Sequence, residues 1–182
     1  SLFDMKDVEF TFEAGRPDCI TAEKLKALGN GGVTRISINT QTANNEILAS
    51  VGRKHTFEDY LNCMNLARKA GISCINTDLI AGLPGESAES FRDSVRKVCE
   101  VEPENVTVHA FTLKRSSEYK TAHMAQVDSS SRAAFEMISF AVSICPKKAM
   151  CRIICTDRRT RSEIWIIPAL PIRERNVCTT SI

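Results

Sequence analysis

Short runs of β-branched residues alternate with longer segments of helical period from the start of the chain to about residue 140. Such alternation is typical of parallel strands joined by crossover helices. It predicts four strand-to-helix units, with strands over residues 8–15, 33–39, 74–82 and 105–113. The chain is therefore expected to fold as an α/β protein.

Polar caps and apolar residues three or four positions apart mark the helices that follow these strands. Thr21, Thr56 and Ser87 stand where an N-cap is expected, because their hydroxyls accept a hydrogen bond from a free backbone N–H of the first turn. The strongest helical segment spans residues 57–70, and the last one runs from about 130 to 141. The residues predicted to face the core are Leu25, Leu28, Tyr60, Leu61, Met64, Ala67, Ala70, Phe91, Val95 and Val98.

Repeated βα units form either an open doubly wound sheet or a (β/α) barrel, and both place their chemistry at the carboxyl ends of the strands. The polar residues in or after these strands are Glu13, Asn39, Gln41, Asp78 and His109. The sequence therefore predicts a ligand site at this end of the sheet.

Asp78 is the most informative of these residues, since it interrupts an otherwise apolar strand. An ionised carboxylate in that position is costly unless a ligand or a basic group faces it. A structural pair with Arg35, or a backbone cap, is the alternative. Glu13 is equally compatible with a solvated edge, and His109 on an apolar strand is more often a core histidine than a ligand. Arg53 is by default part of a solvated loop ahead of a helix.

Composition narrows the class of protein. The chain has 182 residues, of which 43% are apolar and 25% charged, with a net charge of +2. This is enough apolar surface for a core, and it gives no global field that favours nucleic acid or an anionic membrane. The sequence contains no apolar run of bilayer length and no secretory signal pattern. We therefore expect a cytoplasmic protein without membrane insertion, whose eight cysteines are reduced thiols.

Five stretches of the sequence together resemble one family. They read FEAGRPD, VTRISINTQTANNEIL, VGRKHT, INTDLIAGLPGES and VTVHAFTLKRSS, and the match runs over about residues 8–117. The chain resembles the radical S-adenosylmethionine (SAM) family of oxygen-independent coproporphyrinogen III dehydrogenases, which includes haem chaperone-like members.

The resemblance implies a partial TIM-like (β/α) barrel of the radical SAM type, in which a [4Fe-4S] cluster holds SAM and cleaves it reductively. The 5′-deoxyadenosyl radical takes a hydrogen from a propionate side chain, and loss of CO2 and an electron leaves a vinyl group. The implied tetrapyrrole substrate is coproporphyrinogen III, the product is protoporphyrinogen IX, and an electron donor is required. Such radical chemistry belongs to the cofactors, which the protein positions and shields.

By resemblance, six positions match residues that contact SAM in the family: Glu13, Gln41, Arg53, Asp78, Ile80 and Thr112. Arg53 is expected to bind the methionine carboxylate, and Glu13 to face its ammonium group. Gln41 and Asp78 are expected to take the ribose hydroxyls. A guanidinium forks onto a carboxylate, and carboxylates accept from ammonium and hydroxyl groups. Ile80 is expected near the adenine, and Thr112 on the last strand is expected to reach the same ligand.

The cluster requires three thiolates in a CxxxCxxC loop, and no such triple occurs in this sequence. Cys151 and Cys155 have half of that spacing, but they lie at the wrong end of the chain and lack a third partner. No metal ligand and no catalytic residue is therefore assigned. We expect residues 1–141 to form strands three to six of a six-stranded barrel that is incomplete at its N-terminus, with no catalysis by this chain alone.

The last part of the chain differs in character. Residues 145–182 hold eight Lys or Arg against three acids, and they contain half of the cysteines and the single Trp. Codons can be chosen for residues 151–169 that, read one nucleotide earlier, spell the ending expected of the family. Residues 142–182 are therefore predicted to be an atypical basic tail, a frameshifted or non-native ending. A genuine basic extension that binds nucleic acid or a partner is the alternative.

Three other functions stay open. A haem chaperone-like member of the same family would bind SAM and haem without the decarboxylation. A TIM-barrel lyase or isomerase without radical chemistry would need a lysine or an acid–base pair at the strand ends, where Lys114 is the nearby candidate. A degraded gene product or a binding module would have no enzymatic activity.

Overall fold

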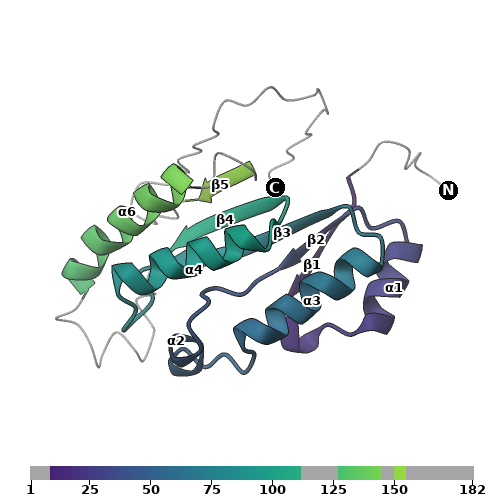
Figure 1. Cartoon of the computed structure of the whole chain (residues 1–182), viewed down its shortest axis with the longest axis horizontal. Helices are drawn as coiled ribbons and strands as arrows, with labels where there is room; N and C mark the ends of the chain where they lie inside the picture. The colour runs from purple at the N-terminus through teal and green to yellow at the C-terminus, as the bar shows by residue number, and fades with distance from the viewer. Residues whose placement is uncertain (1–8, 112–126, 145–149, 155–182) are drawn as a thin grey trace.

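The computed structural model describes residues 9–111, 127–144 and 150–154, which form a parallel sheet with helices against one face (Figure 1). In this part of the chain the strands are ordered β1-β2-β3-β4-β5 across the sheet, and all neighbours are parallel. Their bounds are Thr11–Gly15 for β1, Arg35–Ile38 for β2, Cys74–Ala81 for β3, Asn105–Ala110 for β4 and Met150–Ile154 for β5.

A helix follows each of the first four strands and leads to the next one (Figure 1). The helices are η1 (Pro17–Cys19), α1 (Ala22–Asn30), α2 (Asn45–Ser50), α3 (Phe57–Lys69), α4 (Ala88–Glu100) and α6 (Val127–Ile144). Spatial order that follows chain order, with helices on one face, is the arrangement of a (β/α) barrel, whereas a doubly wound sheet reverses its order and is covered on both faces. The predicted partial barrel of four βα units is confirmed.

The predicted helix starts are also confirmed. The hydroxyls of Thr21 and Ser87 each accept a hydrogen bond from the backbone N–H three residues further on. At the start of α3, Thr56 and Asp59 exchange hydrogen bonds in a capping box. These caps satisfy first-turn donors that would otherwise lack partners, so they determine where each helix begins relative to the loop before it.

The face of the sheet beneath the helices is apolar and forms the core. Its buried strand residues are Ile36, Ile38, Ile75, Leu79, Ala81, Val106 and Val108. The helices contribute Leu25, Tyr60, Met64, Phe91, Val95 and Met137 to the same cluster. One polar pair lies within it, since the hydroxyls of Tyr60 and Thr77 are 2.9 Å apart. Each satisfies the other, which removes the cost of burying them.

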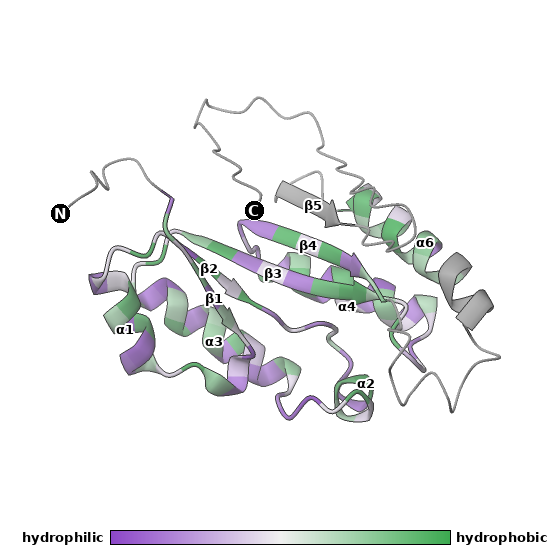
Figure 2. Ribbon diagram, turned by 180° about the vertical axis from the view of Figure 1, so that it is seen from behind, coloured by the Kyte–Doolittle hydropathy of each residue, from purple (hydrophilic) through white to green (hydrophobic). Residues whose placement is uncertain are grey.

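The opposite face of the sheet is not covered by these helices, as the view from behind shows (Figure 2). Side chains alternate between the two faces along a strand, and Figure 2 shows this as bands of different hydropathy along β3 and β4. The register aligns Glu13, Ser37, Asn76 and Asn105 in one row across four strands. We call this side the polar face; its residues are Glu13, Ser37, Asn76, Asp78, Asn105, Thr107 and His109.

The structure differs from the sequence prediction at the strand ends and after α6. β1 begins at Thr11 and β4 ends at Ala110, so both strands are shorter than predicted. β5 was not predicted, because it falls in the segment assigned to the basic tail. It pairs with β4 over five residues, and this pairing satisfies the N–H and C=O groups along an edge that β4 would otherwise expose.

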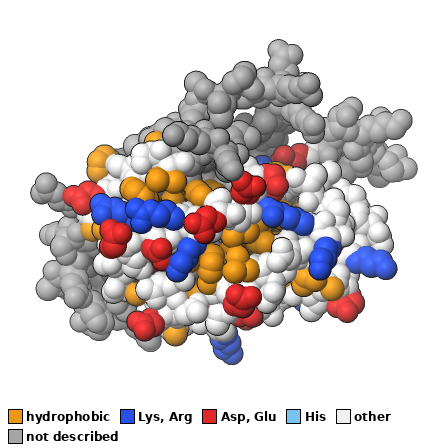
Figure 3. All heavy atoms as spheres, in the orientation of Figure 1, with side chains coloured by type: hydrophobic (Ala, Val, Ile, Leu, Met, Phe, Trp, Pro, Cys, Tyr) orange, Lys and Arg blue, Asp and Glu red, His pale blue; other side chains and the backbone are white. Residues whose placement is uncertain are grey.

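The helix-covered side presents a mixed charged surface (Figure 3). On α4, Glu89 lies 3.3 Å from Arg92 and 3.6 Å from Arg96, and Asp93 lies 2.8 Å from Lys97. Exposed pairs of this kind contribute at most about 1 kcal/mol each. Their main effect is to intersperse the two signs of charge, so α4 presents no patch of a single sign.

Candidate site on the polar face of the sheet

Asp78 is held on the polar face by two neighbouring side chains. Its Oδ1 accepts a hydrogen bond of 2.7 Å from Nδ2 of Asn76, and its Oδ2 lies 3.6 Å from Nε2 of His109. Arg35 instead pairs with Glu9 at 3.6 Å, so the alternative in which Asp78 is paired with Arg35 is wrong. Asp78 remains partly exposed, with 17% of its side chain accessible, and can therefore still reach a ligand.

Asn76 connects three strands through its side-chain amide. Nδ2 donates to Ser37 on β2 at 3.0 Å as well as to Asp78. Oδ1 accepts from Asn105 at 2.8 Å and from Thr107 at 2.9 Å, both on β4. An amide has two donors and two acceptor positions, so all of them are used. The orientation of Asn76, and with it that of Asp78, is determined by this network.

His109 was one of the polar residues expected at the strand ends, with a core histidine as the more common alternative, and it lies on the polar face. Its side chain is 33% exposed, and in the register it is paired with Ile80 of β3. It forms an ion pair with Asp78 when the imidazole is protonated. The side of β4 that carries His109 is therefore part of the candidate site.

Gln41 follows β2 and lies beside Asp78 through its backbone. Its N–H donates to the carbonyl oxygen of Asp78 at 3.0 Å, and its own carbonyl accepts from the N–H of Ile80 at 2.8 Å. Its φ angle is +72°, in the left-handed region that L-residues rarely adopt. The structure thus brings Gln41 and Asp78 together at the carboxyl end of β3.

Glu13 shares the polar face but lies two strands away from β3. It is aligned with Ser37, and its side chain is exposed. Within the described residues no hydrogen bond or ion pair joins it to another side chain. This arrangement fits the prediction of a ligand-facing carboxylate and equally the alternative of a solvated edge.

Arg53 follows α2, which lies beyond the carboxyl ends of the strands (Figure 2). Its backbone N–H donates to the carbonyl of Leu48 at 2.9 Å, and its side chain is half-buried. In the described part of the chain, no hydrogen bond or ion pair joins its side chain to Gln41 or Asp78. Ile80 is half-buried on the same side of β3 as Asp78. Thr112, like Lys114, lies outside the described residues.

Four polar residues around Asp78 were not among the predicted site residues: Ser37, Asn76, Asn105 and Thr107. A signal was present, because Asn76 and Asp78, and Asn105, Thr107 and His109, recur with the period of two that separates the faces of a strand. Glu86, which follows the turn after β3, is a further buried polar residue that was not predicted as part of the site. It contacts the loop that carries Gln41.

The described cysteines do not fit an iron–sulfur cluster. No group of three potential ligands is present in the described ranges. Burial raises the pKa of the Cys63 thiol to about 12 and also raises the pKa of Cys74, whereas cluster ligands are thiolates. The polar face does fit SAM in its carboxylates, because Asp78 and Glu13 are partly or fully exposed and can accept from the hydroxyl and ammonium groups of that molecule.

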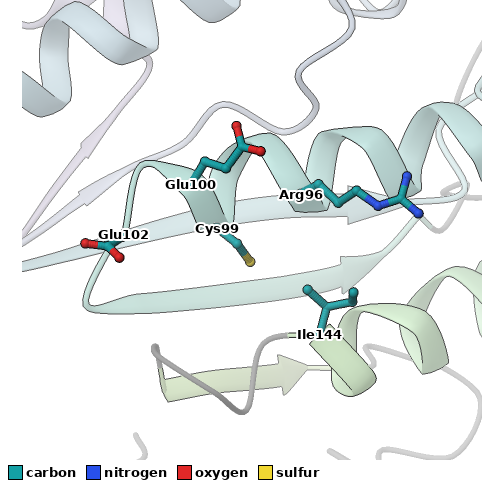
Figure 4. Close-up of a pocket in the computed structure, with 5 residues that line it drawn as sticks. All are labelled: Arg96, Cys99, Glu100, Glu102 and Ile144. Carbon is teal, nitrogen blue, oxygen red and sulfur yellow. The ribbon is translucent and has the colours of Figure 1, made fainter.

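A separate hollow lies at the other end of the sheet (Figure 4). It is lined by Arg96, Cys99, Glu100, Glu102 and Ile144, at the ends of α4 and α6. These residues precede β4 and β5, so the hollow lies toward the amino ends of the strands. It is not part of the candidate site.

Comparison with protein families agrees with this fold, in which a parallel sheet has its helices on one side and a polar opposite face. Residues 4–98 match the model of the Radical SAM superfamily, and this is about half of the chain. The chain belongs to the radical SAM superfamily. Within it, the chain is similar to coproporphyrinogen-III oxidase-like proteins and to heme chaperones.

Two relatives from Bacillus subtilis illustrate this similarity. The chain is 47% identical over 119 residues to the oxygen-independent coproporphyrinogen-III oxidase-like protein HemZ, covering 65% of this chain and 24% of that protein. It is 34% identical over 106 residues to the heme chaperone HemW, covering 58% of this chain and 28% of that protein. The chain thus spans about a quarter of the length of these relatives.

A solved structure supports the same family and fold. Coproporphyrinogen III oxidase (HemN) from Escherichia coli, a radical SAM enzyme, matches with a TM-score of 0.63 and 26% identity, over 75% of this chain and 32% of that one. The family and fold class expected from the sequence are therefore confirmed. Among the described helices, none has the length and apolar character needed to cross a membrane.

Proposed function

We propose that this chain contributes the SAM-binding part of a radical SAM enzyme that oxidatively decarboxylates coproporphyrinogen III to protoporphyrinogen IX. The observation that carries the proposal is Asp78 on the polar face, with the backbone of Gln41 beside it, in a chain of the radical SAM superfamily. The 47% identity to a coproporphyrinogen-III oxidase-like protein supports a tetrapyrrole as the substrate class.

In this proposal Asp78 and Gln41 bind the ribose hydroxyls, Glu13 the ammonium group and Arg53 the carboxylate of SAM. Ile80 packs near the adenine, and Thr112 is assigned to the same ligand by resemblance alone. SAM supplies the radical chemistry when it is bound to a [4Fe-4S] cluster, and the residues named here bind and orient it. No cluster ligand is assigned to the described residues. The further partner is an electron donor in the cytoplasm, and no nucleic acid or membrane is proposed.

The test uses the protein at the full length of its open reading frame, reconstituted anaerobically with iron and sulfide. It should cleave SAM and release CO2 from coproporphyrinogen III. Asp78→Asn removes the charge that strengthens hydroxyl binding and should raise the Kd for SAM by roughly tenfold. Asp93→Asn is the matched control, because Asp93 pairs with Lys97 on the surface of α4. Failure to bind a cluster, or equal effects of both variants, would contradict the proposal.

A haem-trafficking function is the second candidate, and the 34% identity to a heme chaperone favours it. In that case the reconstituted protein should bind haem stoichiometrically and release no CO2 from coproporphyrinogen III. Both functions use the same SAM site, so the effect of Asp78→Asn on SAM affinity is expected in either case.

The division of the chain at residue 142 is also part of this proposal. The segment 142–182 would arise from a reading-frame change, so that its cysteines and basic residues have no selected role. Strand β5 (Met150–Ile154) lies within it and continues the sheet. Sequencing the underlying DNA decides: a single-base change near codons 142–145 should restore the ending of the family, and the idea is wrong if none does.

A further inference from the structure

We propose that Glu86 is a positioning residue for Gln41. It fixes residues 40–44, which we call the Gln41 loop, in the conformation that holds Gln41 beside Asp78. The inference rests on the proposed SAM site, and it gives the glutamate that follows the Gly-Leu-Pro-Gly turn a role in that site.

Gln41 needs such support because its backbone is strained. The φ angle of +72° costs free energy for any residue with a Cβ atom, and strained positions persist only where the surroundings determine them. Two backbone hydrogen bonds to β3, of 3.0 and 2.8 Å, hold Gln41 from one side. They connect it to Asp78 and Ile80, so a shift of the loop would separate two of the proposed ligand residues.

Both neighbours of Gln41 in the chain are fully buried and hydrogen-bonded. Thr40 and Thr42 have no exposed surface, and the hydroxyl of Thr40 donates to the carbonyl of Thr42 at 2.7 Å. The carbonyl of Thr40 lies 3.3 Å from Nε2 of His55. The loop therefore has one anchor before Gln41 and needs a second one after it.

Glu86 provides that second anchor. The hydroxyl of Thr42 donates to Oε1 of Glu86 at 2.5 Å, and the hydroxyl of Ser90 donates to the same oxygen at 3.4 Å. Ser94 of α4 adds a contact of 3.0 Å with the Thr42 hydroxyl and accepts from the N–H of Ala43 at 3.0 Å. These bonds join the loop after β2 to the beginning of α4, which is distant in the sequence.

A carboxyl group is an expensive choice for this anchor. Glu86 is only 8% exposed, and its Oε2 is buried without a hydrogen-bond partner among the described residues. Burial raises the pKa of Glu86 to about 7. A neutral side chain would avoid this cost, so stability alone does not account for Glu86. A short, charge-assisted bond that fixes Thr42 does account for it.

The test measures amide hydrogen exchange of Gln41 and Ile80 in the full-length protein, together with the Kd for SAM after reconstitution. Glu86→Ala should speed exchange at both amides and raise the Kd by roughly tenfold, the value of a hydrogen bond to a charged group. Glu86→Gln keeps the Oε1 acceptor but removes the charge, so it should change both readouts less than Glu86→Ala does. Glu89→Gln, which changes an exposed acid of α4, should leave them unchanged.

A double-mutant cycle separates positioning from general destabilisation. If Glu86 acts through Gln41, then Glu86→Ala should change the Kd for SAM less than twofold in a Gln41→Ala background. An undiminished effect in that background, or unchanged exchange at Gln41, would overturn the inference. If Glu86→Ala does not fold, Thr42→Val removes the same hydrogen bond and is used in the same cycle.

The two readouts also separate this inference from the proposed function. If the wild-type protein binds no SAM, the proposed function fails and the role of Glu86 in ligand binding fails with it. Amide exchange then still decides whether Glu86 fixes the Gln41 loop. If SAM binds and Glu86→Ala alters neither readout, the inference alone is wrong.

Discussion

The two faces of the sheet are made from alternate residues of the same strands, but they meet different surroundings. On β3, Leu79 points into the core beneath the helices, whereas its neighbours Asp78 and Ile80 lie on the polar face and are half-buried. Each large apolar side chain that is fully buried stabilises the fold by about 1.5 to 3 kcal/mol, while a hydrogen bond contributes a net of about 1 kcal/mol. Stability therefore comes mainly from one face, and the geometry of the site from the other.

The two faces also differ in the substitutions that they accept. Apolar side chains of similar volume can replace one another at modest cost. An amide such as that of Asn76, with all four of its hydrogen-bonding positions used, has no isosteric substitute that keeps them. Substitutions on the polar face should therefore disturb the geometry of the site more than they lower the stability of the fold.

The largest expected effect concerns the core face. Leu79→Ala should lower the free energy of unfolding by about 3 to 4 kcal/mol, because it removes buried contacts and leaves a cavity. Urea denaturation measures this value. The Kd for SAM under native conditions should change less than twofold. If the free energy of unfolding fell by less than about 1 kcal/mol, this face would not supply most of the stability.

The next effect concerns the buried carboxyl group of Glu86, which lies in the loop after β3 and not on the sheet itself. Burial raises the pKa of Glu86 from 4.5 to about 7, so the folded state holds the proton more tightly than the unfolded state. Below pH 4.5 both states are protonated, and from there to about pH 7 stability should fall by roughly 2 to 3 kcal/mol as the unfolded state releases its proton first.

Glu86→Gln removes this dependence. The variant should be more stable than the wild type above pH 7, and the two should converge near pH 4.5. Urea unfolding at several pH values measures the difference, and Glu89→Gln serves as the exposed control. Parallel pH profiles of wild type and Glu86→Gln would show that the carboxyl group is not buried in the folded protein.

A smaller effect is expected at the centre of the polar face. Asn76→Ala leaves buried groups of Ser37, Asn105 and Thr107 without their partner, and should cost about 2 kcal/mol of stability. It should also weaken SAM binding, because Asp78 loses the bond to its Oδ1. Asn105→Ala is the matched control, since it removes a bond to Asn76 but none to Asp78. Equal effects of both variants on the Kd for SAM would contradict this account.

The smallest effect is expected at Ile80. It is half-buried on the same side of β3 as Asp78, so Ile80→Ala should reduce stability by less than about 1 kcal/mol. The Kd for SAM should nevertheless rise by a few-fold if Ile80 packs near the adenine. Leu79→Ala is the matched comparison, because it should lower stability with little effect on the Kd for SAM, whereas Ile80→Ala should do the reverse. A larger stability loss for Ile80→Ala than for Leu79→Ala would contradict the assignment of stability to the core face.

Much of the fold could be predicted from local signals. Thr21, Thr56 and Ser87 were identified as caps, and each one is confirmed, because capping depends on residues three positions apart. β5 could not be predicted, since Met150–Ile154 becomes a strand by pairing with β4. The pairing of Asp78 with His109 could not be predicted for the same reason, since it depends on the register of β3 and β4. Asn76 lies two residues from Asp78, and the period of two places both on one face.

Local sequence is enough to predict the alternation of strands and helices, the apolar stripes that bury one face, and the positions of the caps. These properties depend on neighbours within about one helical turn, which are the same before and after folding. The packed fold was needed to show that Gln41 lies beside Asp78, that Arg35 pairs with Glu9 instead of Asp78, and that Glu86 bonds to Thr42 in the loop after β2. The contacts of Gln41 and Glu86 join residues 37 to 44 positions apart, and their geometry exists only once the sheet and its helices are packed.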